Sequence, residues 1–186
     1  SSDVCSSDLG PTANLSRANL SGVQIADADL SYADLSDTRL TRLVATGANL
    51  KYTDLSHAIA DRAKFDSANL GGSSLNYATL NNTSFISAVL SSTFLREVDL
   101  TNAILTGADL SSAILDDSDL EGANFESSNL SNASLDAAKL ASSNFQAADC
   151  LMASLHLADL SDSNLIDAYF SQADLSEADL SGADLS

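Results

Sequence analysis

The sequence predicts an all-β solenoid, a rod of short extended segments that turn at regular corners and stack coil on coil. Three observations lead to this fold class. Every fifth residue from Leu15 to Leu185 is apolar, a small residue lies two positions before it, and a turn-forming residue often lies two positions after it. A step of five residues rotates an α-helix by about 140° and would scatter the leucines around it, so a helix is excluded.

The apolar residue of each unit, here called the central position, is nearly invariant. Of 35 central positions 26 are Leu, five are Phe and one is Ile, and the exceptions are Ala45, Ala60 and Cys150. Two residues earlier, at the small position, 23 of the 35 residues are Ala. Because a spacing of two places both side chains on one side of an extended segment, both are expected to point inward.

The second residue after each central position is predicted to turn the chain. Residues that tolerate tight-turn backbone angles recur there: Gly22, Gly47, Gly72, Gly107, Gly122 and Gly182, and also Asp27, Asp37, Asn82, Asn102, Asp117, Asn132, Asp162 and Asp167. One such unit cannot bury its own leucine. The units are therefore stable only when successive coils stack, which predicts a β-solenoid.

The repeated unit closely resembles the motif of the pentapeptide-repeat family, Ala-(Asp or Asn)-Leu followed by two variable residues. Ala173-Asp174-Leu175 and Ala178-Asp179-Leu180 are examples, and the resemblance covers residues 13–185 in one register. It implies a right-handed quadrilateral parallel β-helix with four pentapeptides per coil. The sequence would then form about 8–9 coils, a rod of about 41 Å at the usual strand spacing.

The phenylalanines give an independent check on a coil of 20 residues. Phe65, Phe85, Phe125 and Phe145 recur at multiples of 20 and are expected to form one interior ladder, whereas Phe170 lies on another side. Ala60, the central residue just before Phe65, is expected to leave volume for the ring.

The chain departs from the pattern in three places. Residues 1–11 do not fit the repeat, which divides the chain into this leader and a solenoid over 12–186. For the leader we weigh native sequence against a leftover of cloning or sequence assembly. Leu43 occupies a small position, which predicts a local bulge. The repeat reaches Leu185 without a capping helix, which predicts either a fragment or end-to-end association of two copies.

Composition excludes several classes of function. The net charge of −18 argues against direct binding of nucleic acid, which requires clustered Lys and Arg. With neither a long apolar segment nor a secretory signal, the chain is expected to be soluble and cytoplasmic, without a membrane partner. Cys5 and Cys150 are too few for a disulfide framework, and His57 and His156 lie about 24 Å apart, too far to share a metal.

No catalytic constellation is found, so the chain is not expected to be an enzyme or to carry a cofactor or metal. The surface is more informative. Asp99, Asp119, Asp159 and Asp179 recur on one side of the predicted coil, here called the acidic wall. The same side is basic nearer the N-terminus. These residues are candidates for binding a partner. The alternative is that Asp occurs there because short polar side chains bond to the local backbone.

Phe94 and Ile114 form a second candidate for partner binding. Both occupy nominally exposed positions one coil apart, where a contiguous apolar patch would mark a contact site. The alternative is ordinary packing along the wall.

Two functions of different classes fit these observations. The first is a non-catalytic structural or protein-interaction module with an unknown partner, similar to the regular repeat proteins common in cyanobacteria. The second follows from the resemblance, because pentapeptide-repeat proteins associated with fluoroquinolone resistance bind DNA gyrase by mimicking DNA. Residues 97–186 carry a net charge of −16 over about 22 Å. Duplex DNA of that length carries about 13 charges, which is comparable.

Overall fold

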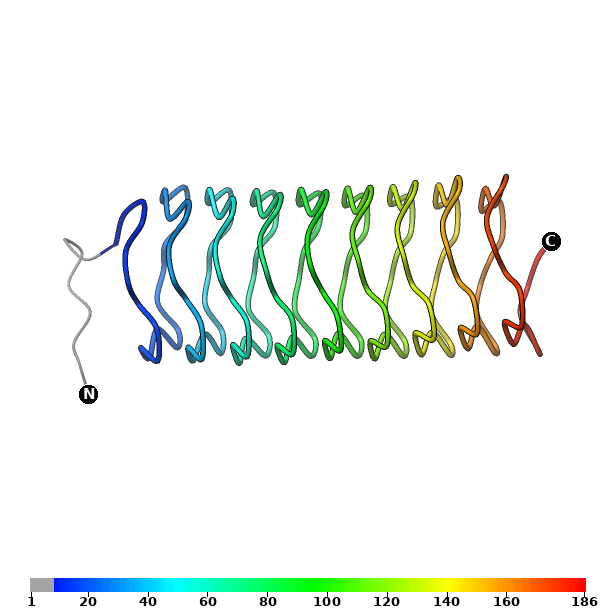
Figure 1. The fold of residues 1–186 in the computed structure, drawn as a ribbon, viewed down its shortest axis with the longest axis horizontal. Coiled ribbons are helices and arrows are strands. Elements are labelled where there is room, and N and C mark those ends of the chain that lie inside the picture. Colours follow the sequence, from blue (N-terminus) through cyan, green and yellow to red (C-terminus); the bar gives the residue numbers. More distant parts are fainter. Residues whose placement is uncertain (1–8) are drawn as a thin grey trace.

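Residues 9–186 form one straight rod of stacked coils that runs from one end of this range to the other (Figure 1). The computed structural model describes residues 9–186, so most of the leader over 1–11 lies outside the described residues. Within 9–186 there is neither a helix nor an extended strand. The β structure consists instead of isolated parallel bridges that link residues twenty apart, from Asn14↔Asp34 to Asn164↔Asp184. These bridges confirm the predicted coil of 20 residues.

Within residues 9–186 the corners are β-turns, and all but the one after Leu95 are closed by a backbone hydrogen bond. The carbonyl of the central residue accepts from the amide three residues later, as in Ala18 N to Leu15 O at 2.9 Å. At the corner after Leu95 the amide of Val98 donates instead to Oγ of Ser118 at 3.4 Å. The second residue after each central position has a positive φ at every corner from Thr12 to Gly182. This left-handed conformation is required even at Tyr52 and Leu157, for which it is unfavourable.

Backbone hydrogen bonds along the rod join each coil to the next. The amide of a central residue donates to the carbonyl of the residue before the next coil's central position, as in Leu15 N to Asp34 O at 2.8 Å. The residue before each central position is here called the bridge position. Its amide donates back to the previous coil, as in Asp34 N to Ala13 O at 2.9 Å. All four sides of the coil are therefore paired in parallel.

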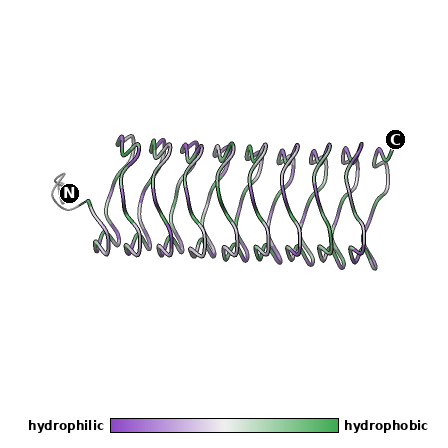
Figure 2. Cartoon of the chain, turned by 90° about the horizontal axis from the view of Figure 1, so that it is seen from above, coloured by the Kyte–Doolittle hydropathy of each residue, from purple (hydrophilic) through white to green (hydrophobic). Residues whose placement is uncertain are grey.

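The core is one continuous column inside the coils. Central and small positions point inward and are almost completely buried over most of the rod. Apolar and polar residues consequently alternate within every coil (Figure 2). The predicted phenylalanine ladder is confirmed, because Phe65 and Phe85 stack with ring centroids 5.2 Å apart and Phe125 and Phe145 at 4.8 Å. Phe170, on another side, approaches Phe145 at 6.4 Å with a tilted ring.

The bulge predicted at Leu43 is not found. Leu43 is buried, and Val44 next to it keeps the regular bridges to Gln24 and Lys64. The central residue of the same pentapeptide is Ala45, so a large and a small side chain have exchanged places. The total volume is conserved, which is the kind of change that a core tolerates best.

The final coil is more open than the others. Phe170, Leu175 and Leu180 are half-buried, and 66% of Leu185 is exposed. Association of this end with another copy stays a prediction. No helix within residues 9–186 is long and apolar enough to cross a membrane.

Candidate interaction surfaces

The four aspartates of the acidic wall occupy one row of bridge positions. Parallel bridges join Asp99 to Asp119, continue through Lys139, and reach Asp159 and Asp179. Lys139 interrupts the row and forms an ion pair with Asp119, with Nζ and Oδ2 3.5 Å apart. The structure thus brings the predicted residues into one line with a single cation among them.

Each of these carboxylates also bonds to its own corner. Oδ1 accepts from the backbone amide two residues later, at 3.2 Å for Asp99, 3.3 Å for Asp119, 3.0 Å for Asp159 and 2.9 Å for Asp179. The amide and hydroxyl of Ser181 lower the pKa of Asp179, because both bonds favour the charged carboxylate. The bonding of these aspartates to the local backbone, the alternative to partner binding, is therefore present. It occupies one oxygen of each side chain.

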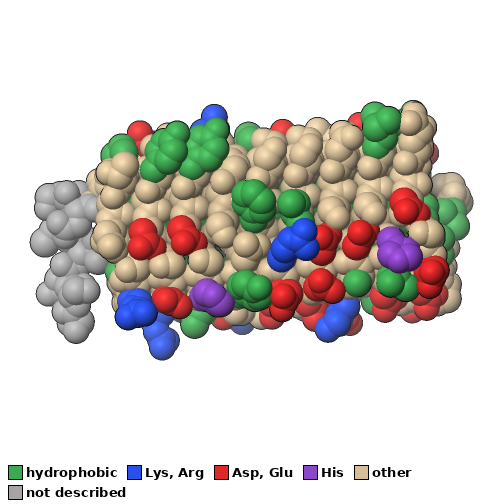
Figure 3. Space-filling model, viewed as in Figure 1, with side chains coloured by type: hydrophobic (Ala, Val, Ile, Leu, Met, Phe, Trp, Pro, Cys, Tyr) green, Lys and Arg blue, Asp and Glu red, His purple; other side chains and the backbone are tan. Residues whose placement is uncertain are grey.

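Phe94 and Ile114 lie on adjacent coils, joined by a parallel bridge. Phe94 is 44% exposed, whereas Ile114 is only partly exposed. Figure 3 shows apolar side chains together midway along the rod with charged side chains beside them. Arg96 and Asp116 follow two residues later and form an ion pair of 2.6 Å. The apolar pair is therefore held next to a fixed charged pair.

The two candidate sets meet at one corner of the rod. Phe94 and Ile114 precede the corner, and Asp99 and Asp119 follow it, in the same two coils. A shallow groove of about 600 Å³ on the acidic side of this corner is lined by Glu97, Val98, Asp99, Asp117 and Asp119. Two carboxylates at the corner thus add to two on the acidic wall, and the apolar pair lies on the wall before the same corner.

Glu97 and Asp117 were missed by the sequence analysis as members of this surface. Both are corner residues with positive φ. The signal that could have found them is their spacing, since residues twenty apart align and each lies two positions before an aspartate of the acidic wall. Glu97 and Asp117 lie on the corner between the wall of Phe94 and the acidic wall, so neither wall alone includes them.

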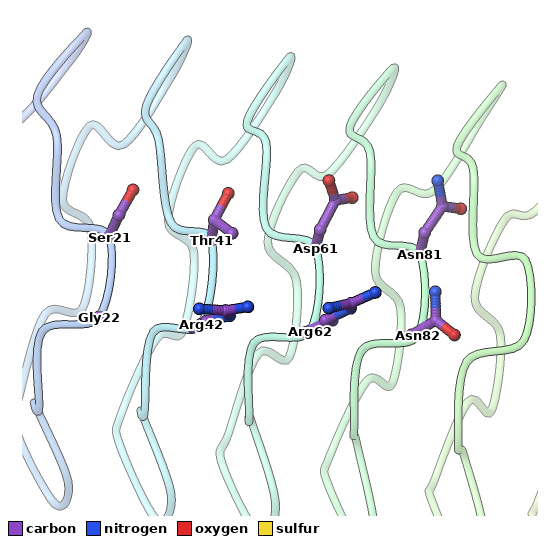
Figure 4. A pocket seen from close by; sticks show the side chains of 8 residues that line it. All are labelled: Ser21, Gly22, Thr41, Arg42, Asp61, Arg62, Asn81 and Asn82. Carbon is purple, nitrogen blue, oxygen red and sulfur yellow. The ribbon is translucent and has the colours of Figure 1, made fainter.

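A second groove lies on another corner, nearer the N-terminus. It has a volume of about 600 Å³ and is lined by Ser21, Gly22, Thr41, Arg42, Asp61, Arg62, Asn81 and Asn82. Figure 4 shows two parallel rows, with Arg42 and Arg62 side by side in one and Thr41, Asp61 and Asn81 in the other. The Oδ1 atoms of Asp61 and Asn81 are enclosed and have no hydrogen-bond partner within residues 9–186.

The two histidines and Cys150 have structural surroundings. His57 stacks on Tyr77 with ring centroids 5.0 Å apart, and Nδ1 of His156 lies 2.9 Å from Oγ of Ser176. Burial raises the pKa of the Cys150 thiol to about 12, with a smaller contribution from the charge of Asp149. No group of three or more His, Cys, Asp or Glu side chains in the described part of the chain is placed to hold a metal ion.

Comparison with known proteins agrees with the repeat geometry. The family model for pentapeptide repeats matches in eight copies, over residues 13–42, 24–59, 63–102, 103–140, 118–149 and 153–186. The chain belongs to the pentapeptide-repeat family. A sequence comparison with curated proteins gives no match.

Two solved structures illustrate the relationship. HetL, a pentapeptide-repeat protein involved in heterocyst differentiation regulation from the cyanobacterium Nostoc sp. strain PCC 7120, is 34% identical, with 92% of this chain and 84% of HetL covered and a TM-score of 0.46. A trypsin-treated variant of QnrB1, a plasmid-mediated fluoroquinolone resistance protein, is 21% identical, with 93% of this chain and 87% of QnrB1 covered and a TM-score of 0.69. The likeness to QnrB1 shows a shared fold.

Proposed function

We propose that this chain is a non-catalytic interaction module that binds a protein partner at the corner between Phe94 and Asp119. The observation that supports the proposal most is that a partly exposed apolar pair precedes, on two adjacent coils, the corner that carries four carboxylates. A partner segment that carries an apolar anchor beside Lys or Arg side chains would complement this surface. We also infer that the coil is right-handed, as in the family, and that this chain forms about 8–9 coils.

The apolar pair would supply the anchor. Burying Phe94 and Ile114 in a partner removes apolar area from water, and aromatic anchors surrounded by polar groups are typical of binding hot spots. The carboxylates would set specificity, because charge complementarity steers encounter and disfavours acidic partners. Their own corners occupy only Oδ1 of Asp99 and Asp119 with backbone amides.

Matched variants test this surface. Phe94→Ser with Ile114→Ser removes the anchor, and Ile86→Ser with Ile104→Ser removes comparable exposed apolar groups from another wall and the corner that follows it. Proteins captured from a bacterial extract by the intact chain should be lost with the first pair and retained with the second. Equal capture by both pairs, with coils intact by circular dichroism, would contradict the proposed surface.

The second candidate is DNA mimicry directed at DNA gyrase, and the row of aspartates from Asp99 to Asp179 favours it. Negative charge at coil spacing would be attracted to a basic DNA-binding groove, and the attraction would fall as salt rises. The test is inhibition of gyrase supercoiling by the intact chain and by a variant with all four row aspartates replaced by Asn. A control variant with Asp34, Asp54 and Asp109 replaced by Asn alters bridge positions on other walls. No effect of the intact chain at tens of micromolar would remove the gyrase candidate.

A further inference from the structure

The strongest unexplained feature outside the acidic corner is a cluster of cations in a strongly acidic protein. The chain has eight Lys and Arg residues against 26 acids. Four of the eight, Arg39, Arg42, Arg62 and Lys64, lie at one corner or on the walls directly before and after it. A surface of random composition with this net charge would surround each cation with acids.

These four cations are not neutralised by ion pairs. The ion pairs formed within residues 9–186 use the three cations Arg17, Arg96 and Lys139. Asp61 is the one carboxylate that lines the groove, and no ion pair joins it to Arg42 or Arg62. Arg42 and Arg62 therefore lie on adjacent coils, at the usual coil spacing of about 4.8 Å, and neither forms an ion pair within residues 9–186.

The fold gives no structural reason for this arrangement. Arg42 and Arg62 occupy corner positions with φ of 59° and 57°, in a row where Gly22 precedes them and Asn82 follows. Gly and Asn suit the left-handed conformation better than Arg does. Neighbouring like charges repel, so the pair costs stability unless an anion lies between the two side chains.

We propose that Arg42 and Arg62 form a binding site for the phosphoryl group of a small hydrophilic molecule, such as a sugar phosphate. A phosphate monoester carries nearly two negative charges, which match the two guanidinium groups, and its three terminal oxygens can accept from both forks. A carboxylate has two oxygens and occupies one fork only. The hydroxyl of Thr41 and the amide of Asn82 line the same groove and can donate to the remaining acceptors.

The dimensions of the site favour a small molecule over a polymer. The groove has a volume of about 600 Å³, within the usual range for small-ligand sites. The pair of arginines spans a single coil spacing, whereas nucleic acid requires a longer track of cations. Apart from Gly22, every lining residue carries a polar side chain, which fits the hydroxyl groups of a sugar. This inference is independent of the proposed protein-binding corner, because none of its residues contributes to that corner.

Titration calorimetry with inorganic phosphate, glucose 6-phosphate and acetate at low ionic strength tests the proposal. The two phosphates should bind saturably with glucose 6-phosphate the tighter, and acetate, with a single carboxylate, should bind at least tenfold more weakly. Arg42→Gln with Arg62→Gln should weaken phosphate binding about a hundredfold, at about tenfold for each charged donor pair lost. Arg17→Gln with Lys51→Gln removes the same charge elsewhere and should leave binding unchanged.

A gain-of-affinity variant makes the test sharper. Asp61→Asn keeps the shape of the side chain and removes the carboxylate from the groove, so phosphate should bind several-fold more tightly. Shifts of backbone amide NMR signals on adding phosphate should centre on residues 41–42 and 61–62. The proposal is overturned by the absence of phosphate binding, by equal binding of acetate, or by unchanged binding to the Arg42→Gln, Arg62→Gln variant with intact circular dichroism.

Discussion

Truncation of Phe125 to alanine tests whether the interior ladder stabilises the rod. The Phe125 side chain is completely buried and stacks on Phe145 with ring centroids 4.8 Å apart. Replacing a buried phenylalanine by alanine costs about 3–5 kcal/mol through lost transfer free energy and the cavity that remains. Loss of the stacked pair contributes about 0.5–1.5 kcal/mol within that total. We therefore expect a loss near the upper end of the range.

Two further truncations provide reference values for the loss of stability at Phe125. Phe170 is half-buried and contacts Phe145 with a tilted ring at 6.4 Å, so Phe170→Ala should cost about half as much as Phe125→Ala. Phe94 is 44% exposed and lies on the outside of the coil, so Phe94→Ala should cost less than about 1 kcal/mol. The expected order of destabilisation is Phe125, then Phe170, then Phe94.

Urea unfolding measures these losses. Circular dichroism and tyrosine fluorescence should be followed together, because coincident transitions establish that one cooperative event is measured. A loss below about 1 kcal/mol for Phe125→Ala would refute the interior position of this ring and with it the stacked register. A loss for Phe94→Ala as large as that for Phe125→Ala would refute the assignment of inner and outer faces.

Three further predictions concern polar groups. The buried hydroxyl of Ser73 has no hydrogen-bond partner within residues 9–186, whereas the hydroxyl of Ser118 donates to Leu95 O at 2.6 Å. Ser73→Ala should therefore stabilise the rod by about 1 kcal/mol and Ser118→Ala should destabilise it, as measured by urea unfolding. With Cys5 replaced by Ser, the Cys150 thiol should react with a disulfide reagent only at the rate of unfolding, because burial raises its pKa to about 12. The lowered pKa values of Asp29, Asp174, Asp179 and Asp184 contribute stability above the ordinary carboxyl pKa, so the melting temperature should fall as the pH drops below about 4.

The five-residue pattern predicts the inside of the coil, and the family resemblance implies 20 residues per coil. The spacing of Phe65, Phe85, Phe125 and Phe145 supports that number, and the bridges show the register throughout residues 14–184. The physical reason is that stacked coils of constant length place residues with a fixed separation in the sequence next to each other in space. A residue twenty positions away is always the nearest neighbour along the rod.

Side-chain direction and pairing could not be predicted in the same way. Tyr52 covers Gly72, where an added Cβ would lie 2.6 Å from the ring, and nothing in the five-residue motif specifies that contact. Arg96 pairs with Asp116 across a coil, whereas Arg42 and Arg62 pair with no acid within residues 9–186. These contacts and ion pairs depend on side-chain rotamers and on the other hydrogen bonds that each carboxylate forms. Neither can be inferred from the spacing of residues in the sequence.

The aspartates of the acidic wall are not the residues that local structure would favour most. On another wall, asparagines at the same bridge position form a ladder in which Nδ2 of Asn144 donates to Oδ1 of Asn124 at 3.0 Å, and Asn164 continues it. Asparagine keeps the bond to the corner amide and adds a bond between coils. Adjacent aspartates such as Asp99 and Asp119 cannot donate to each other, and their charges repel.

This comparison separates a structural role of the acidic wall from a functional one. Replacing Asp99 and Asp119 by Asn should leave the unfolding free energy within about 0.5 kcal/mol of the original, since a new amide bond and relief of repulsion offset the exposed ion pair to Lys139. Capture of the partner should nevertheless be lost, because two of the four carboxylates at the corner are removed. Urea unfolding and capture are measured on the same preparation. If the free energy of unfolding falls by more than about 1 kcal/mol, the carboxylates stabilise the coil. Their presence on the acidic wall is then explained without a partner.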